Sequence, residues 1–89
     1  MQESSAGGVR DLAWAGRHAE AIEQANWRLD APRLDAATRL DLLEARGDSR
    51  VALGDLEAAA ADAAAMLALA KSSGKAAFAS RARSFECLV

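Results

Sequence analysis

Two short stretches decide the fold of this chain: residues 16–22 (GRHAEAI) and residues 54–59 (GDLEAA). They begin 38 residues apart, and the same shift aligns Gly16 with Gly54, Ala21 with Ala59, Ala25 with Ala63 and Leu29 with Leu67. The matched residues trace one turn and one face of the helix that follows it. A third unit is less sharply defined, since a shift of 38 aligns Leu40 with Phe78 and a shift of 37 aligns Ala45 with Ala82. An internal repeat of this length is typical of helical repeat proteins.

The spacing of apolar residues around these stretches predicts five helices and no strand. Apolar positions recur every three or four residues, as on one side of a helix. The expected helices run from 9 to about 16, from about 17 to 29, from 34 or 35 to about 53, from 55 to about 70, and from about 75 to the end. Glycine at 16 and 54 allows the chain to reverse between antiparallel helices. Residues 1–8 are small and polar, so we expect a disordered lead-in before a single domain at 9–89.

Composition agrees with an all-helical domain and excludes several classes of protein. The 89 residues include 24 Ala and 11 Leu, which are strong helix formers, and the length suits one small domain. The 13 acidic and 11 basic residues give a net charge of −2, which argues against a general nucleic-acid binder. A single Cys and a single His cannot form an internal disulfide or a structural zinc site. With no signal peptide and no membrane span, the expected location is the cytoplasm.

Gly47 lies in the middle of the third expected helix, where glycine costs about 1 kcal/mol relative to alanine. We expect a neighbouring helix to cross closely at this position, which would account for the missing side chain. The alternative is that residues 47–49 (GDS) break the helix in two.

The two opening stretches resemble the inter-helix turn of tetratricopeptide (TPR) repeats, in which a Gly, often followed by Asp, precedes an acidic residue and a small Ala. Leu43 and Gly47 are similar to the large and small residues of the preceding helix in such repeats. The spacing of 38 exceeds the usual length of about 34, so the chain resembles the degenerate, longer TPR-like repeats of bacterial regulators. The resemblance covers residues 9–89. It implies an all-α fold of antiparallel helix-turn-helix repeats, with two repeats and a terminal helix forming a short right-handed α-solenoid.

No arrangement of residues in the sequence indicates an enzyme, a cofactor or a metal site. His18 has no Ser, Cys or second His at useful spacing, and Cys87 has no basic neighbour closer than Arg83 that could activate the thiol. The acidic residues lack the spacing of a calcium loop. Residues 46–48 (RGD) match an adhesion tripeptide, but they fall in an expected helix rather than an exposed loop.

The arginines of the third and fifth expected helices are a further feature of the sequence. They are Arg39, Arg46, Arg50, Arg81 and Arg83. They could meet phosphate or an acidic partner, but we expect a solvated face that pairs with Asp35, Asp41 and Glu57.

The resemblance to TPR-like repeats implies a non-catalytic protein–protein interaction module of a bacterial regulatory or signalling protein. In such repeats, the first helix of each pair lines a concave groove. Carried over to this chain, the groove residues are Arg10, Trp14, Asp41, Glu44, Asp48 and Glu86. The family's clamp for a terminal carboxylate is absent, because its positions carry Ala6, Glu44 and Ala82. An acidic floor with an aromatic edge instead favours a basic or apolar segment of a protein or peptide.

Trp14 is the best single contact residue, since exposed Trp is enriched at binding hot spots. The alternative is that Trp14 packs the first helix onto the second, beside Trp27. A different function is also open, namely self-assembly into a homodimer through the unfinished end of the repeat. The apolar side of the last helix would supply that surface, with Phe78, Phe85 and Leu88.

Overall fold

The structure is a computed structural model that describes the backbone of residues 7–88 and the side chains of residues 8–86. Its elements are α1 (Gly7–Trp14), α2 (His18–Leu29), α3 (Ala36–Ala52), α4 (Leu56–Ser73) and α5 (Ala76–Leu88). The predicted all-α architecture is confirmed for this part of the chain, which holds five helices and no strand. Helix α1 begins two residues earlier than expected, so Gly7 and Gly8 are helical. The rest of the expected lead-in, residues 1–6, lies outside the described range.

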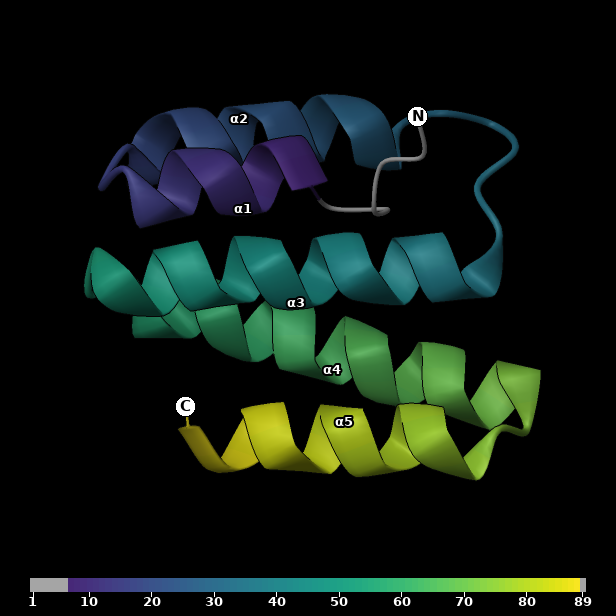
Figure 1. Ribbon diagram of the computed structural model, residues 1–89. Coiled ribbons are helices and arrows are strands. Elements are labelled where there is room, and N and C mark those ends of the chain that lie inside the picture. Colours follow the sequence, from purple (N-terminus) through teal and green to yellow (C-terminus); the bar gives the residue numbers. More distant parts are fainter. Residues whose placement is uncertain (1–6, 89) are drawn as a thin grey trace.

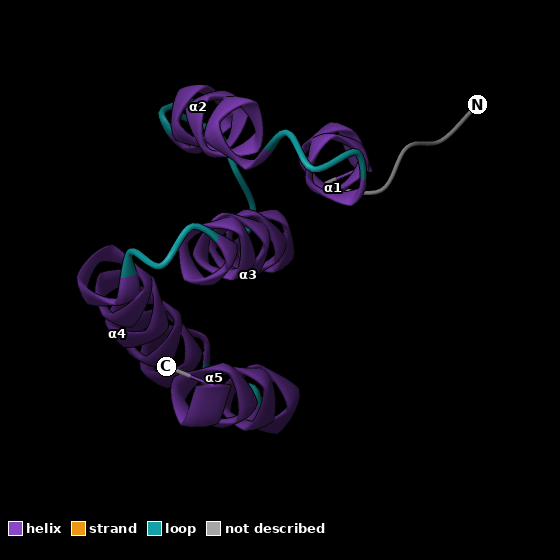
Figure 2. Ribbon diagram, turned by 90° about the vertical axis from the view of Figure 1, so that its left-hand side faces the viewer, coloured by secondary structure: helices purple, strands orange, loops and turns teal. Residues whose placement is uncertain are grey.

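The helices stack in chain order, with α1 and α2 at one end and α5 at the other (Figure 1). Figure 2 shows the stack end-on: α2 and α1 lie side by side at the top, α3 lies beneath them, and α4 and α5 follow below, with α1 furthest to the right and α4 furthest to the left. The molecule measures 33 × 33 × 20 Å. The shortest dimension is the thickness of two packed helices, each of which is about 10 Å in diameter. We call the side formed by α1, α3 and α5 the α1–α3–α5 face.

The turns that follow α1 and α3 have the same backbone geometry, 38 residues apart. In both, the N–H of a glycine donates to the carbonyl three residues back at 3.0 Å, and the next N–H donates to the carbonyl five residues back at 2.9 Å. Gly16 and Gly54 adopt φ angles of 80° and 82°, which residues with a side chain rarely adopt. This is the Schellman arrangement that ends a helix and reverses the chain. The repeat seen in the sequence is therefore present in the backbone of the two turns.

Acidic side chains cap the first turn of two of the helices. Asp35 accepts a hydrogen bond from the backbone N–H of Thr38 at 2.8 Å, and Asp55 accepts one from Ala58 at 3.3 Å. These bonds satisfy N–H groups that have no partner within the helix. Hydrogen bonding to Thr38 also holds the pKa of Asp35 below its ordinary value.

The core consists of two apolar clusters, one on each side of α3. The cluster among α1, α2 and α3 contains Val9, Ala21, Ala25, Leu42 and Ala45. The cluster among α3, α4 and α5 contains Leu40, Leu43, Ala59, Ala63, Met66, Ala70, Phe78, Ala82 and Phe85. The alanines that the repeat aligns are buried in both clusters, where small side chains let helices pack closely. Helix α3 therefore holds the two halves of the molecule together.

Gly47 does not break α3, which runs without interruption through residues 47–49. A Cβ atom placed on Gly47 would lie 2.3 Å from Cζ of Phe85, so the ring of Phe85 occupies the space that a side chain would need. The expected close crossing is confirmed, and the alternative of a broken helix is wrong.

The predicted self-association surface on α5 requires a correction. Phe78 and Phe85 are buried against α3 and α4, and Phe85 is only 2% exposed. The side of α5 that carries Phe78 and Phe85 faces the core, because Gly47 of α3 has no side chain and leaves room for the ring of Phe85. The side chain of Leu88, the third predicted residue, lies outside the described part of the chain.

Candidate functional site

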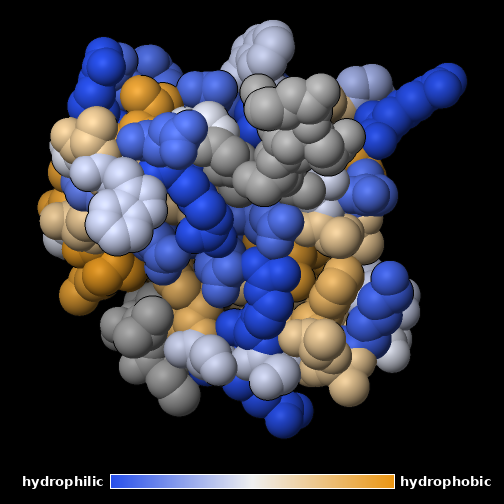
Figure 3. Space-filling view, in the orientation of Figure 1, coloured by the Kyte–Doolittle hydropathy of each residue, from blue (hydrophilic) through white to orange (hydrophobic). Residues whose placement is uncertain are grey.

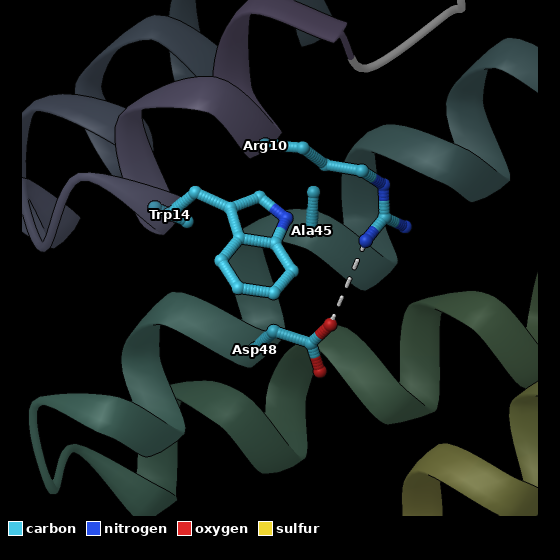
Figure 4. A pocket seen from close by; sticks show the side chains of 5 residues that line it. Arg10, Trp14, Ala45 and Asp48 are labelled. Atoms are coloured by element: carbon cyan, nitrogen blue, oxygen red, sulfur yellow. Dashed lines mark ion pairs between the residues drawn. The ribbon is translucent and has the colours of Figure 1, made fainter.

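A hollow of about 310 Å³ opens between α1 and α3 on the α1–α3–α5 face. It is lined by Arg10, Ala13 and Trp14 of α1 and by Ala45 and Asp48 of α3 (Figure 4). Arg10, Trp14 and Asp48 belong to the predicted groove, so the fold brings these three together. Glu86 is exposed on α5 and does not line this hollow.

Trp14 is 90% exposed at the edge of this hollow. Its position follows from the geometry of α1, since Trp14 lies five residues after the buried Val9 and thus about 140° around the helix from it. Arg10 is four residues before Trp14 and shares its side of the helix. The alternative that Trp14 packs against α2 beside Trp27 is wrong, because neither side chain is buried: Trp14 is 90% exposed and Trp27 is 78% exposed.

Ion pairs join the three helices across the α1–α3–α5 face. Oε1 of Glu44 accepts hydrogen bonds from Arg10 at 3.2 Å and from Arg81 at 2.5 Å, so one carboxylate on α3 links α1 and α5. Arg81 also donates to Asp41 at 2.8 Å. Burial opposes the charge on Arg81, but these hydrogen bonds outweigh it and raise the pKa of the guanidinium. The predicted groove acids Asp41 and Glu44 are therefore on this face, but their charges are already compensated.

Asp48 differs from Asp41 and Glu44 in its ion pairing. Its side chain is 46% exposed, and its nearest cation is Arg10, at 3.9 Å. That distance is too long for a direct hydrogen bond. Partial burial, together with the negative charge of Glu44 one helical turn away, raises the pKa of the Asp48 carboxyl. Asp48, which supplies a carboxylate to the lining of the hollow, is thus less compensated than Asp41 and Glu44.

A second ionic cluster, between α3 and α4, was not expected from the sequence. Asp62 is only 1% exposed and accepts hydrogen bonds from Arg46 at 2.5 Å and from Arg50 at 2.9 Å. Arg46 also donates to Asn26 of α2 at 2.7 Å. The expected solvated arginine face is therefore wrong for Arg46 and Arg50, which neutralise a buried acid. The sequence did contain one sign of this cluster. Asp62 is a single charge within an alanine-rich run, and an acid that is buried in such a run needs a cationic partner.

His18 does have a serine partner, contrary to the expectation from sequence spacing. Its Nδ1 lies 3.2 Å from Oγ of Ser49, 31 residues away. Ser49 is fully buried, so its hydroxyl is out of reach of a substrate, and the pair joins the start of α2 to α3. Among the side chains that the structure describes, no three His, Cys, Asp or Glu residues come together as metal ligands. No helix in residues 7–88 is long and apolar enough to cross a membrane.

The surface of the α1–α3–α5 face is mixed in character. Figure 3 shows a band of hydrophilic side chains across its middle, with apolar residues on either side. Elsewhere, Trp27 borders two further hollows, of about 420 Å³ and 600 Å³. Leu53 and Leu56 are also exposed, at the turn between α3 and α4.

Comparison of the chain with models of known protein families, with curated proteins and with solved structures gives no match.

Proposed function

We propose that the chain is a non-catalytic protein-binding module and that its partner, a basic or apolar segment, binds on the α1–α3–α5 face. The observation that carries this proposal is Trp14, whose indole is 90% exposed beside a hollow between two helices. An aromatic side chain offers about 150–250 Å² of surface for burial. At about 25 cal/mol per Å², a partner that covers such a ring gains several kcal/mol before the costs of association.

The ion pairs on this face favour Trp14 over Trp27 as the contact residue. Arg10 and Arg81 both hold Glu44, so α1 and α5 are tied to α3 on either side of the groove. A surface that is fixed in this way loses little conformational freedom when a partner binds. By contrast, the hollow of about 420 Å³ beside Trp27 is lined in part by a loop and not by helices alone. The loop joins α2 to α3 and contributes Asp30, Ala31 and Leu34 to this lining.

The wider setting of the proposal comes from the TPR-like resemblance. Helical repeats of this kind serve as scaffolds in bacterial regulatory and signalling proteins, and we place this chain in the cytoplasm in that role. Homodimerisation through α5 is the weaker candidate. The aromatic side chains that suggested it are buried, and the outward side of α5 offers small residues such as Ala76, Ala79 and Ser80.

Selection of peptides from a random displayed library on the wild-type domain tests the proposal. Peptides selected in this way should bind Trp14→Ala at least tenfold more weakly, because truncating a hot-spot residue removes about 2 kcal/mol or more. Trp27→Ala is the matched control, since it removes a second largely exposed indole that lies away from the groove. Thermal unfolding of both variants should match the wild type. If the selected peptides bind Trp14→Ala as well as wild type, this face is not the binding surface.

A further inference from the structure

We infer that Trp14 and Asp48 together form a site for the cationic side chain of an arginine or lysine in the partner segment. The inference rests on the proposed function and specifies what the hollow between α1 and α3 recognises.

The two residues lie on opposite sides of one hollow. Trp14 comes from the end of α1 and Asp48 from the C-terminal half of α3, and both line the same space of about 310 Å³. Figure 4 shows the indole extending from α1 toward α3, with Asp48 alongside it. A guanidinium or ammonium group attracts the face of an indole within about 6 Å of the ring centre. A cation that enters this hollow can therefore contact the ring and the carboxylate together.

Charge compensation distinguishes Asp48 from Asp41 and Glu44, the other acids that α3 places on this face. Asp41 and Glu44 each bind Arg81, and Glu44 also binds Arg10, so an incoming cation would have to break existing hydrogen bonds to reach them. Asp48 has only the long 3.9 Å pair with Arg10. Its carboxylate is available to a new partner without the loss of a hydrogen bond.

The neighbours of Asp48 also favour a cation over an anion or a neutral group. Glu44 lies one helical turn away, and its charge, added to partial burial, makes the ionised form of Asp48 unfavourable and raises its pKa. A bound cation relieves that penalty, whereas an acidic side chain would increase it. Arg10 does not oppose the cation fully, because its guanidinium is drawn toward Glu44 at 3.2 Å.

The experiment uses the peptides selected from the random library on the wild-type domain. We expect them to share one Arg or Lys position, and replacing that residue with Ala should weaken binding about three- to tenfold. The same replacement should weaken binding to Asp48→Asn less than binding to wild type, because only the contact with the Trp14 ring is then left to lose. Selection on Asp48→Lys should enrich Asp or Glu at the corresponding position. Asp11→Asn is the control, since it removes the same charge from α1 outside the hollow.

The outcomes separate this inference from the proposed function. Peptides that depend on Trp14 but share no basic position, or that bind Asp48→Asn and wild type equally, would overturn the cation site and leave the binding face in place. Peptides that bind independently of Trp14 would refute both the proposed binding face and the cation site. A basic position whose contribution falls in both Asp48→Asn and Trp14→Ala, and is unchanged in Asp11→Asn, supports the inference.

Discussion

The substitution Gly47→Ala should destabilise the chain, although alanine is the better helix former. In an open helix interior this change gains about 1 kcal/mol. At Gly47, however, the new Cβ would lie 2.3 Å from Cζ and 2.7 Å from Cε2 of Phe85. The ring is 2% exposed and packed among α3, α4 and α5, so it cannot move aside freely. Overpacking of this kind costs about 1–3 kcal/mol, and the direct clash with a ring places the cost at the upper end.

The expected net loss is therefore about 1–2 kcal/mol, or a fall in Tm of about 5–15 °C for a domain of this size. Thermal unfolding followed by far-UV circular dichroism measures it. Gly8→Ala is the matched control, because its Cβ would meet only the flexible end of Gln24 at 3.0 Å. In a Phe85→Leu background, Gly47→Ala should no longer destabilise, since the ring is gone. A Gly47→Ala protein that melts at or above the wild-type temperature would refute the packing argument.

Three further predictions follow from the ionic groups and the fold. Asp62→Ala leaves Arg46 and Arg50 without their buried partner and should lower the unfolding free energy by about 3 kcal/mol in denaturant titration; a loss below about 1 kcal/mol would contradict the role given to this cluster. Asp48→Asn should melt above wild type at neutral pH, because the raised pKa of Asp48 means that its ionised form is disfavoured in the folded state. This gap should close as pH falls through the folded pKa of Asp48 and the wild-type carboxyl becomes protonated; a gap that does not change with pH would refute it. Light scattering at two concentrations tenfold apart should give a mass near 9.3 kDa at both, whereas a mass that rises with concentration would favour homodimerisation.

The fold was predictable because its determinants are local. The glycine turns depend on φ angles near 80° that sequence alone can anticipate at Gly16 and Gly54. Helix positions follow from the spacing of apolar residues, and the expected helix starts near residues 35 and 55 coincide with the capping residues Asp35 and Asp55. The early start of α1, at Gly7, was missed because two adjacent glycines are poor helix formers.

The candidate site was predictable only in part, because it depends on which helix faces meet. Arg10, Trp14 and Asp48 were placed in one groove by analogy with the TPR-like repeats that the sequence resembles, and the fold does bring them together. Periodicity put Phe78 and Phe85 on one stripe of α5, but it does not say whether a stripe faces solvent or a neighbouring helix. The answer came from Gly47 on α3, which accommodates the ring.

The other contacts that the sequence did not predict join residues that are far apart in the chain. The arginines that neutralise Asp62 are 16 and 12 residues away, and Ser49 is 31 residues from His18. No local pattern selects these partners, because helix α3 carries several arginines and each could face solvent or the core. The ion pairs of Glu44 with Arg10 and Arg81 likewise appear only once α1 and α5 are placed on either side of α3.

The proposal that the α1–α3–α5 face binds a protein segment is tested most directly by chemical-shift mapping. A ¹⁵N-labelled domain is titrated with a peptide selected on the wild-type protein. The predicted result is movement of the Trp14 indole signal and of amides around the hollow on α1 and α3, while the Trp27 indole stays in place. Shifts centred on Trp27 and α2, with the Trp14 indole unmoved, would contradict it.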